Sequence, residues 1–294
     1  MKRIISFCVI VLIGTGFFSC ASSPSLGQNS SSVWKISRNG NTMFLGGSVH
    51  ILRESDYPLP NEFDRAFSQS ASLVLETDVE QLANESVLQY LMSRMYLPAN
   101  QTLRSILDSS AYEQLYAAFS EYGLLLDGVS NFKPSMVINI LTLLQIQKLG
   151  FVQEGVDFYY LEKAKNEKKP VGYLESIETQ IDLMVTMGDG YENDFVRYSL
   201  YDMANTESEL SLLLDEWKNG GSSKTEEALL EMRDEWPQIY RTVVTDRNGA
   251  WMPQLEQYLA SGKISFVIVG LAHIHGPDGL LRQLENAGCT VEFF

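Results

Sequence analysis

The feature that most constrains this fold is a β-rich run near the end of the chain, "ISFVIVG", which leads into the loop "LAHIHG". A continuous apolar run rich in β-branched residues is typical of a strand buried on both faces. A second strand, "TMFLGG", is expected near the start of the chain. Each strand leads into a Gly-x-x-His motif, Gly47 to His50 and Gly270 to His273. Both ends of the chain are therefore expected to contribute strands to a helix-covered sheet.

Turn and strand signals around the first motif agree with this expectation. Asn39-Gly40 is a two-residue turn signal between alternating apolar and polar residues, and it predicts a hairpin whose second strand covers residues 42–46. A helix is expected from about residue 61 to 70. The run "ASLVLETD" then predicts a buried strand with Glu76 at its carboxyl end.

The middle of the chain, from about residue 80 to 250, has mostly helical patterning. "SMVINILTLLQIQKLG" combines apolar residues at helical spacing with Gly150 as a stop. "KKPVGYLES" predicts a short strand that ends in Glu175. After the second motif, "GPDGLLRQLENAG" predicts a helix and "CTVEFF" a last strand, so the order strand, Gly-x-x-His loop, helix, strand occurs twice. The expected fold class is α/β (mixed α+β).

Three side chains at expected strand ends could form one site. His50, Glu76 and His273 each follow a strand, and ligands of open, helix-flanked sheets bind at the carboxyl ends of the strands. Gly47 and Gly270 would let the backbone turn sharply or approach a ligand closely. Two imidazoles and a carboxylate can hold a divalent metal with open positions for water and substrate. The metal would lower the pKa of bound water, and a carboxylate could take its proton.

The alternative is that each histidine only satisfies hydrogen bonds at a strand end. The chain has three histidines in all, and they lie only in these two loops, which favours a shared site. His275 could point away from His273 along an extended segment, and we expect it to be a bystander.

The net charge and the N-terminal segment limit which partners the protein could bind and where it could be located. A formal charge of -15 without a Lys/Arg cluster argues against nucleic acid as a partner. Two basic residues precede "IISFCVIVLIGTGFF", a stretch too short for a membrane span and typical of a secretory signal. The following "FFSCASS" resembles a bacterial lipoprotein signal, with ordinary cleavage or an uncleaved anchor as alternatives.

In the lipoprotein interpretation, residues 1–19 are the signal and Cys20 is the acylated first residue of the mature chain. Residues 20–32 then form a flexible tether. The acyl chains would hold an exported protein in the cell envelope, at the outer membrane or a periplasmic face. Cys289 would be the one cysteine left in the mature fold, so packing must stabilise that fold without an internal disulfide.

Several stretches together resemble the TraB/GumN family, also called the TraB/PrgY/GumN group. The resemblance rests on "MFLGGSVH", "ASLVLETD", "PVGYLESIETQ", "TDRNGAWMPQLEQYL" and "FVIVGLAHIHGPDGLLRQLENAGCTVEFF". It implies a mixed sheet built from two similar halves, flanked by helices, in one domain over residues 33–294 with a helical insertion at about 80–250. It assigns the first motif to Gly47 and His50, the acidic position to Glu76, and the second motif to Gly270 and His273.

The resemblance also covers a stretch matching Leu174, Glu175, Glu178 and Gln180. Glu175 and Glu178 would share a face if this segment is helical. The alternative is that the two carboxylates only stabilise a helix N-terminus.

A second supporting pair matches Arg247 and Asn248. Arg247 could clamp a substrate carboxylate or carbonyl, or it could form an ion pair with a site glutamate. Two departures from the family pattern are mild: Ser48-Val49 replaces the more usual Thr-Ile, and His275 stands where an apolar residue is more common.

The resemblance implies a hydrolase, since its animal relatives, the Tiki proteins, are membrane-tethered metalloproteases acting on Wnt ligands. The chain would then be a peptidase with a peptide or protein substrate and a divalent metal (Mn²⁺, Co²⁺ or Zn²⁺) on His50, His273 and Glu76. Other relatives are erythromycin-esterase-like and haem-binding proteins, so fold alone does not fix activity. A non-catalytic protein that binds a peptide, a signal molecule or haem is the alternative, and a purely structural envelope protein is a third.

Overall fold

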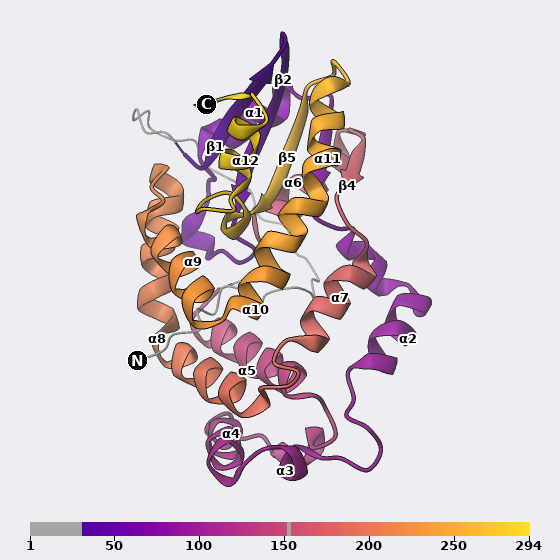
Figure 1. The fold of residues 1–294 in the computed structure, drawn as a ribbon, viewed down its shortest axis with the longest axis vertical. Helices are drawn as coiled ribbons and strands as arrows, with labels where there is room; N and C mark the ends of the chain where they lie inside the picture. Colours follow the sequence, from indigo (N-terminus) through magenta and orange to yellow (C-terminus); the bar gives the residue numbers. More distant parts are fainter. Residues whose placement is uncertain (1–30, 152–153) are drawn as a thin grey trace.

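Six strands form one mixed sheet in the order β4-β3-β5-β2-β1-β6 (Figure 1). Their bounds are β1 (Val33–Arg38), β2 (Asn41–Ser48), β3 (Ser72–Leu75), β4 (Val171–Tyr173), β5 (Ser265–Gly270) and β6 (Thr290–Phe293). This computed structural model describes residues 31–151 and 154–294. The expected signal segment, Cys20 and the expected tether up to residue 30 lie outside the described residues.

Strand β5 has the central position that its apolar run predicts. It lies between β3 and β2, pairs in parallel with both, and all six of its residues are buried. Strand β4 extends the parallel part beyond β3, whereas β1 pairs antiparallel with both β2 and β6. The mixed α/β fold expected from the sequence is confirmed, and strands from both ends of the chain share one sheet.

The hairpin of β1 and β2 forms around the predicted turn. Asn39 and Gly40 have φ angles of 54° and 81°. Positive φ at both central positions is the requirement of a type I′ turn, whose twist matches that of the flanking strands. The ladder runs from the pair Arg38–Asn41 to the pair Val33–Gly46. This hairpin fixes the register of β2 and carries the first Gly-x-x-His motif to the end of that strand.

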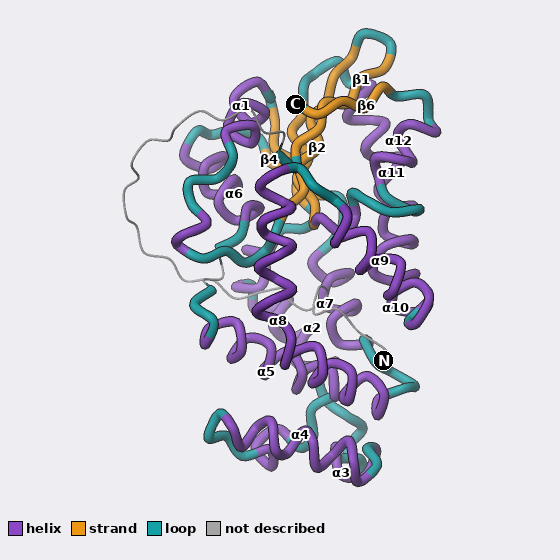
Figure 2. Tube along the Cα trace, turned by 90° about the vertical axis from the view of Figure 1, so that its left-hand side faces the viewer, coloured by secondary structure: helices purple, strands orange, loops and turns teal. Residues whose placement is uncertain are grey.

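Two strand–helix–strand connections place helices on opposite faces of the sheet. Strand β2 leads through α1 (Asn61–Gln69) to β3, and β5 leads through α12 (Leu280–Asn286) to β6. The connections run in opposite directions along the sheet, and because such crossovers are almost always right-handed, their helices lie on opposite faces. In Figure 2, α1 and α6 (Val156–Asn166) lie on one side and α11 (Asp246–Ala260) and α12 on the other.

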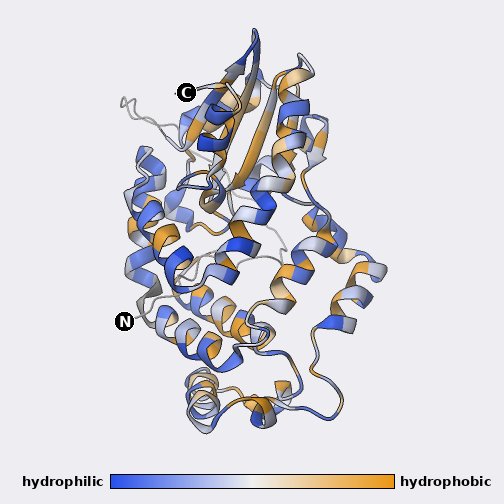
Figure 3. Cartoon of the chain, in the orientation of Figure 1, coloured by the Kyte–Doolittle hydropathy of each residue, from blue (hydrophilic) through white to orange (hydrophobic). Residues whose placement is uncertain are grey.

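Alternate side chains of β5 pack against these two layers. Phe266 and Ile268 belong to the core shared with α1 and α6, whereas Val267 and Val269 belong to the core shared with α11 and α12. Each such burial stabilises the fold by about 1.5–3 kcal/mol. Figure 3 shows β5 as an apolar band between helices whose outer faces are hydrophilic. Cys289 is buried in the second of these cores as a free thiol.

The remaining α-helices lie mostly below the carboxyl end of β5 in Figure 1, where one large and one small cluster of buried apolar residues hold them together. Their bounds are α2 (Glu85–Arg94), α3 (Leu103–Ile106), α4 (Ser109–Glu121), α5 (Pro134–Lys148), α7 (Ile177–Thr186), α8 (Glu192–Asn219), α9 (Ser223–Glu235) and α10 (Pro237–Tyr240). A π-helical segment, Arg241–Thr245, joins α10 to α11 without a break. No helix within residues 31–151 and 154–294 has the length and apolar character needed to cross a membrane.

Candidate functional site

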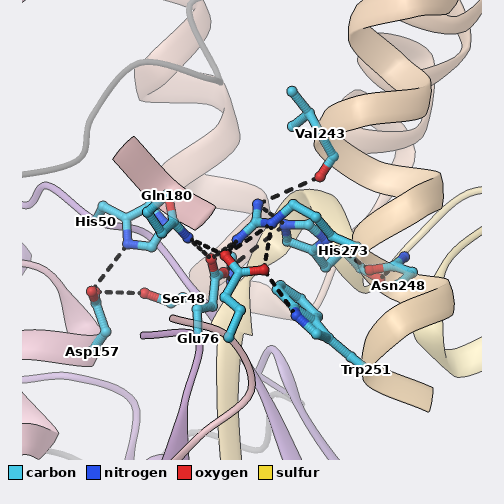
Figure 4. Close-up of polar contacts among 12 residues, drawn as sticks. Ser48, His50, Glu76, Asp157, Gln180, Val243, Asn248, Trp251 and His273 are labelled. Carbon is cyan, nitrogen blue, oxygen red and sulfur yellow. Dashed lines mark hydrogen bonds and ion pairs between the residues drawn. The ribbon is translucent and has the colours of Figure 1, made fainter. Parts of the chain in front are cut away.

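Three neighbouring strands end at the same edge of the sheet, and each is followed by one of the expected site residues. Ser48, the last residue of β2, pairs with Gly270, the last residue of β5, and Glu76 directly follows β3. His50 and His273 lie in the loops that leave β2 and β5. The parallel pairing of these strands therefore brings together three residues that lie far apart in the sequence (Figure 4).

The absence of a side chain on Gly270 leaves room for them to meet. A Cβ on this residue would lie 3.2 Å from Glu76 Oε1, 3.3 Å from His50 Nε2 and 3.7 Å from His273 Cδ2. We call this point, and the three side chains around it, the Gly270 space. The expected convergence of the two motifs and the carboxylate is thus a feature of the fold.

Gly47, the matching glycine of the first motif, has a different surrounding. A Cβ here would lie 2.6 Å from Leu271 Cδ1, within the core, and the Gly47 carbonyl accepts a hydrogen bond of 2.7 Å from Trp217 Nε1. Close packing, and not access to the Gly270 space, requires a glycine at this position.

His50 is held from the far side of its ring by an aspartate. Its Nδ1 lies 3.1 Å from Asp157 Oδ2, and the other oxygen of this carboxylate accepts a hydrogen bond of 2.9 Å from the Ser48 hydroxyl. Burial opposes the charged imidazolium, but the attraction and hydrogen bond of Asp157 outweigh it and raise the pKa of His50 to about 9. The His50 side chain is 32% exposed, so solvent reaches it.

Asp157 reaches His50 because α6 packs closely against the first motif. A Cβ on Gly155 would lie 2.4 Å from the backbone of His50, and the Val156 N–H donates to the Val49 carbonyl. This contact places Asp157, in the first turn of α6, beside the imidazole. Sequence reasoning missed Asp157, because an acidic residue in a first helical turn is common and nothing in its spacing points to His50.

Glu76 is buried, and both of its carboxylate oxygens accept hydrogen bonds. Its Oε1 accepts a hydrogen bond of 2.5 Å from the Gly270 N–H, and its Oε2 accepts from Arg247 at 2.5 Å and from Gln180 at 3.2 Å. Burial alone would raise the pKa of Glu76, but the charge of Arg247, the two neighbouring histidines and the hydrogen bond from the Gly270 N–H together outweigh it and hold this pKa well below its usual range. Glu76 is therefore a carboxylate at neutral pH.

Arg247 lies between the two glutamates of the site and the second histidine. Its Nη2 donates to Glu76 and, at 2.8 Å, to Glu175, while its Nε donates to both Glu175 oxygens. Its Nη1 donates to His273 Nε2 at 2.9 Å. The sequence left two roles for Arg247, a substrate clamp or an ion pair with a site glutamate. In the structure Arg247 forms ion pairs with both Glu76 and Glu175.

His273 is buried, with partners on both ring nitrogens. Its Nδ1 lies 2.7 Å from Asn248 Oδ1, so this nitrogen carries the proton and Nε2 accepts from Arg247. The Asn248 amide also donates to the carbonyls of His273 and Asp278. Burial and the nearby charge of Arg247 lower the pKa of His273 to about 3, so its imidazole is neutral at neutral pH.

The expected pair Glu175 and Glu178 separates in the structure. Helix α7 begins at Ile177 with Ser176 as its N-cap, so Glu175 precedes the helix and the two carboxylates do not share a helical face. Glu175 also accepts a hydrogen bond of 3.0 Å from Trp251 Nε1. Glu178 lies in the first turn of α7, where a carboxylate stabilises the helix N-terminus.

His275 lies apart from the Gly270 space. Its ring packs edge-on against Trp34 with the centroids 5.2 Å apart, and burial lowers its pKa to about 4. Within the part of the chain that the structure describes, His275 Nε2 has no hydrogen-bond partner. His275 therefore packs against β1 and not beside the other two histidines.

The site as arranged does not fit the divalent metal that the resemblance implies. Metal ligands need free lone pairs directed at one point, but the single lone pair of His273 Nε2 accepts from Arg247, which is also ion-paired with Glu76. Among residues 31–151 and 154–294, no group of three or more His, Cys, Asp or Glu side chains could hold a metal. A divalent ion would also meet a fixed guanidinium, and two like unit charges 4 Å apart repel by about 4 kcal/mol at an effective dielectric constant of about 20.

Sequence comparisons identify relatives of this chain. A model of the TraB/PrgY/gumN family matches residues 32–293. A relative from Escherichia coli (strain K12), named "Uncharacterized protein YbaP", is 26% identical over 257 residues, which cover 85% of this chain and 90% of the relative. A protein of the same name from Shigella flexneri is 25% identical over 247 residues, covering 82% of this chain and 87% of the relative. The match to the family model includes both Gly-x-x-His motifs.

Proposed function

The chain belongs to the TraB/PrgY/gumN family, and from that premise we propose that it is a hydrolase that cleaves peptide bonds at the Gly270 space. One observation carries the proposal: His50 Nε2, Glu76 Oε1 and the His273 ring approach a single point at the carboxyl ends of parallel strands. The resemblance to the Tiki metalloproteases supports a peptide or protein as the substrate.

His50 is the group proposed to transfer protons. Its Nε2 faces the space while Asp157 holds Nδ1, which is the arrangement of a general base oriented by a carboxylate. A water molecule gives a proton to Nε2 as its oxygen bonds to the substrate carbonyl carbon. The C–N bond then breaks, and the same proton passes from Nε2 to the leaving nitrogen. Glu76, Arg247 and His273 keep the far side of the space fixed and charged.

The base must be neutral when it takes the proton. Because the pKa of His50 is raised to about 9, only a small share of His50 is neutral at pH 7, and that share grows as pH rises. The proposal therefore includes a rate of hydrolysis that increases from neutral pH to about pH 9. No step in this chemistry passes through a metal.

The direct test is hydrolysis of a peptide library, with products identified by mass spectrometry. His50→Gln removes the base, and we expect the rate to fall by about 10²- to 10⁴-fold. Glu178→Gln is the control, because it neutralises a carboxylate close to Glu175 in the sequence but outside the Arg247 network. The rate of hydrolysis by this variant should equal that of the unmodified chain. Full activity in folded His50→Gln protein would contradict the mechanism.

The second candidate is a protein that binds a peptide, a signal molecule or haem without turnover. The closed hydrogen bonding of Arg247, Glu76 and Glu175 favours it, because this network is satisfied without a substrate. In the same peptide experiment, saturable binding without any product would favour this candidate over the hydrolase. A purely structural role is the least supported of the three, since the two motifs converge.

We further propose that the protein is exported and held in the cell envelope by acylation of Cys20. This rests on the sequence "FFSCASS" after a short apolar stretch, and two acyl chains bind a membrane firmly. The measurement is incorporation of a labelled fatty acid in the unmodified chain and in Cys20→Ala. Equal labelling of the two proteins, or recovery of the unmodified chain without detergent, would rule out this anchor.

A further inference from the structure

We infer that Arg247 is the resident cation of the Gly270 space and that it takes the place of a divalent metal in this chain. The site would then form without a metal and would not accept one between His50, Glu76 and His273. This inference concerns metal binding alone, so it stands or falls separately from the proposed hydrolysis.

The atoms that would be metal ligands already accept hydrogen bonds from the protein. Arg247 donates to Glu76 Oε2 at 2.5 Å and to His273 Nε2 at 2.9 Å, and the Gly270 N–H donates to Glu76 Oε1 at 2.5 Å. His273 Nε2 has a single lone pair, so a metal bound there would have to displace Arg247, whereas each oxygen of Glu76 keeps a second lone pair. His50 and Glu76 without His273 are fewer than the three protein ligands of a catalytic zinc site.

The guanidinium of Arg247 is fixed in position by several contacts. Its Nε and Nη2 form a fork on Glu175, and its Nη1 also donates to the Val243 carbonyl at 3.4 Å. The Trp251 ring lies against it, with 4.6 Å between Cζ and the ring centroid. Arg247 is buried, so these contacts are made away from bulk solvent. Swinging it out of the space would break all of them at once.

The carboxylates of Glu76 and Glu175 also have other donors besides Arg247. Gln180 Nε2 donates to both Glu76 and Glu175, and Trp251 Nε1 donates to the second oxygen of Glu175. Every carboxylate oxygen of the two glutamates therefore accepts a hydrogen bond from the protein. A buried polar network that is complete in this way is rigid, and opening it for a metal leaves donors unpaired.

A π-helical segment lies close to Arg247 in the sequence. Arg247 lies two residues after the π-helical segment Arg241–Thr245, and its Nη1 donates to the Val243 carbonyl within that segment. Such π-helical turns often mark functional positions in otherwise α-helical segments. Here the turn lies just before Arg247, which contacts Glu76 and His273, and Asn248, which contacts His273.

The test is Co²⁺ binding by the full chain purified without chelator or nickel resin, read from ligand-field absorption and from metal content after dialysis. We expect no saturable Co²⁺ in the unmodified chain. Arg247→Met frees His273 Nε2 and leaves Glu76 Oε2 with Gln180 as its one donor, and we expect it to raise Co²⁺ affinity by about tenfold or more. Glu178→Gln, the matched control, should behave as the unmodified chain.

Arg247→Met leaves two buried carboxylates without a cation and could fail to fold. The double substitution Arg247→Met with Glu175→Gln removes one charge of each sign and keeps His50, Glu76 and His273 as possible ligands. Binding of one Co²⁺ per unmodified chain that is lost in His50→Gln would overturn the inference. So would a folded Arg247 variant, single or double, that binds Co²⁺ no better than the unmodified chain.

Discussion

The two Gly-x-x-His motifs end neighbouring parallel strands, yet they place their histidines in opposite environments. His50 is 32% exposed and bonded to an aspartate that raises its pKa to about 9. His273 is buried, with a pKa lowered to about 3 and with Asn248 and Arg247 on its two nitrogens. At pH 7 the first imidazole is charged and the second is neutral. Equal spacing in the sequence therefore does not give equal chemistry; the partner of each ring decides it.

The largest expected effect comes from removing the cation on the His273 side. Arg247→Met leaves buried Glu76 and Glu175 unpaired, and breaking a buried ion pair on one side costs about 3–5 kcal/mol. Arg241→Met is the matched control six residues earlier, because its ion pair with Asp246 is exposed and such pairs contribute about 0–1 kcal/mol. Urea unfolding of the three proteins measures the difference. If the two variants lost the same free energy of unfolding, the buried ion pairs of Arg247 would stabilise the fold no more than an exposed pair does.

The second effect separates the glycines of the two motifs. Gly47→Ala would place a Cβ 2.6 Å from Leu271 Cδ1 inside the core, and overpacking of this kind costs about 1–3 kcal/mol. We expect the free energy of unfolding to fall by that amount, whereas the pKa of His50 should stay near 9. Urea unfolding and an NMR titration of the variant measure both quantities. A stability equal to that of the unmodified chain would show that Gly47 is not needed for packing.

The elements that the sequence predicted well are those with strong local signals. Asn39-Gly40 is compatible with few other turns, and the apolar run of β5 has no amphipathic period that would suit a surface helix. The expected helix at residues 61–70 is α1, shorter by one residue at its end. Each of these follows from a few adjacent residues, so one sequence suffices to identify them.

Contacts between distant segments were beyond the reach of this sequence. Nothing local indicates that β5 inserts between β2 and β3, although the convergence of His50, Glu76 and His273 depends on it. The partner Asp157 was missed for the same reason, since it comes from a helix packed on the first motif. Resemblance to the family singled out Arg247, but only the geometry reveals that its guanidinium takes the His273 Nε2 lone pair that a metal would need.

A smaller effect tests the charge of His50. Asp157→Asn removes the carboxylate that raises its pKa, so we expect this pKa to fall from about 9 towards its ordinary value of about 6.5, or below it through burial. Because the folded-state pKa is raised, the ion pair stabilises the fold fully below about pH 6.5, and this stabilisation is lost as pH rises through about 9. The variant should lack that loss of stability between pH 6.5 and 9.

NMR titration of the imidazole C–H signals checks this prediction in both proteins. In the unmodified chain one signal should titrate near pH 9, and the His273 signal should not titrate between pH 5 and 9. Two histidines titrating together near pH 6.5 would abolish the contrast between the motifs.

The smallest effect on stability belongs to Gly270→Ala, and it is the most informative about function. The new Cβ would lie 3.2–3.7 Å from Glu76, His50 and His273, close enough to fill the Gly270 space without meeting backbone atoms. We expect the free energy of unfolding to change by less than about 1 kcal/mol, because only side-chain atoms must shift slightly. Peptide hydrolysis, in contrast, should fall at least about tenfold, since the methyl group takes the position of the attacking water. Gly47→Ala is the opposite case, with lower stability and an open space. If Gly270→Ala kept full activity, the reacting atoms would lie elsewhere, and the convergence of the two motifs would be a matter of folding alone.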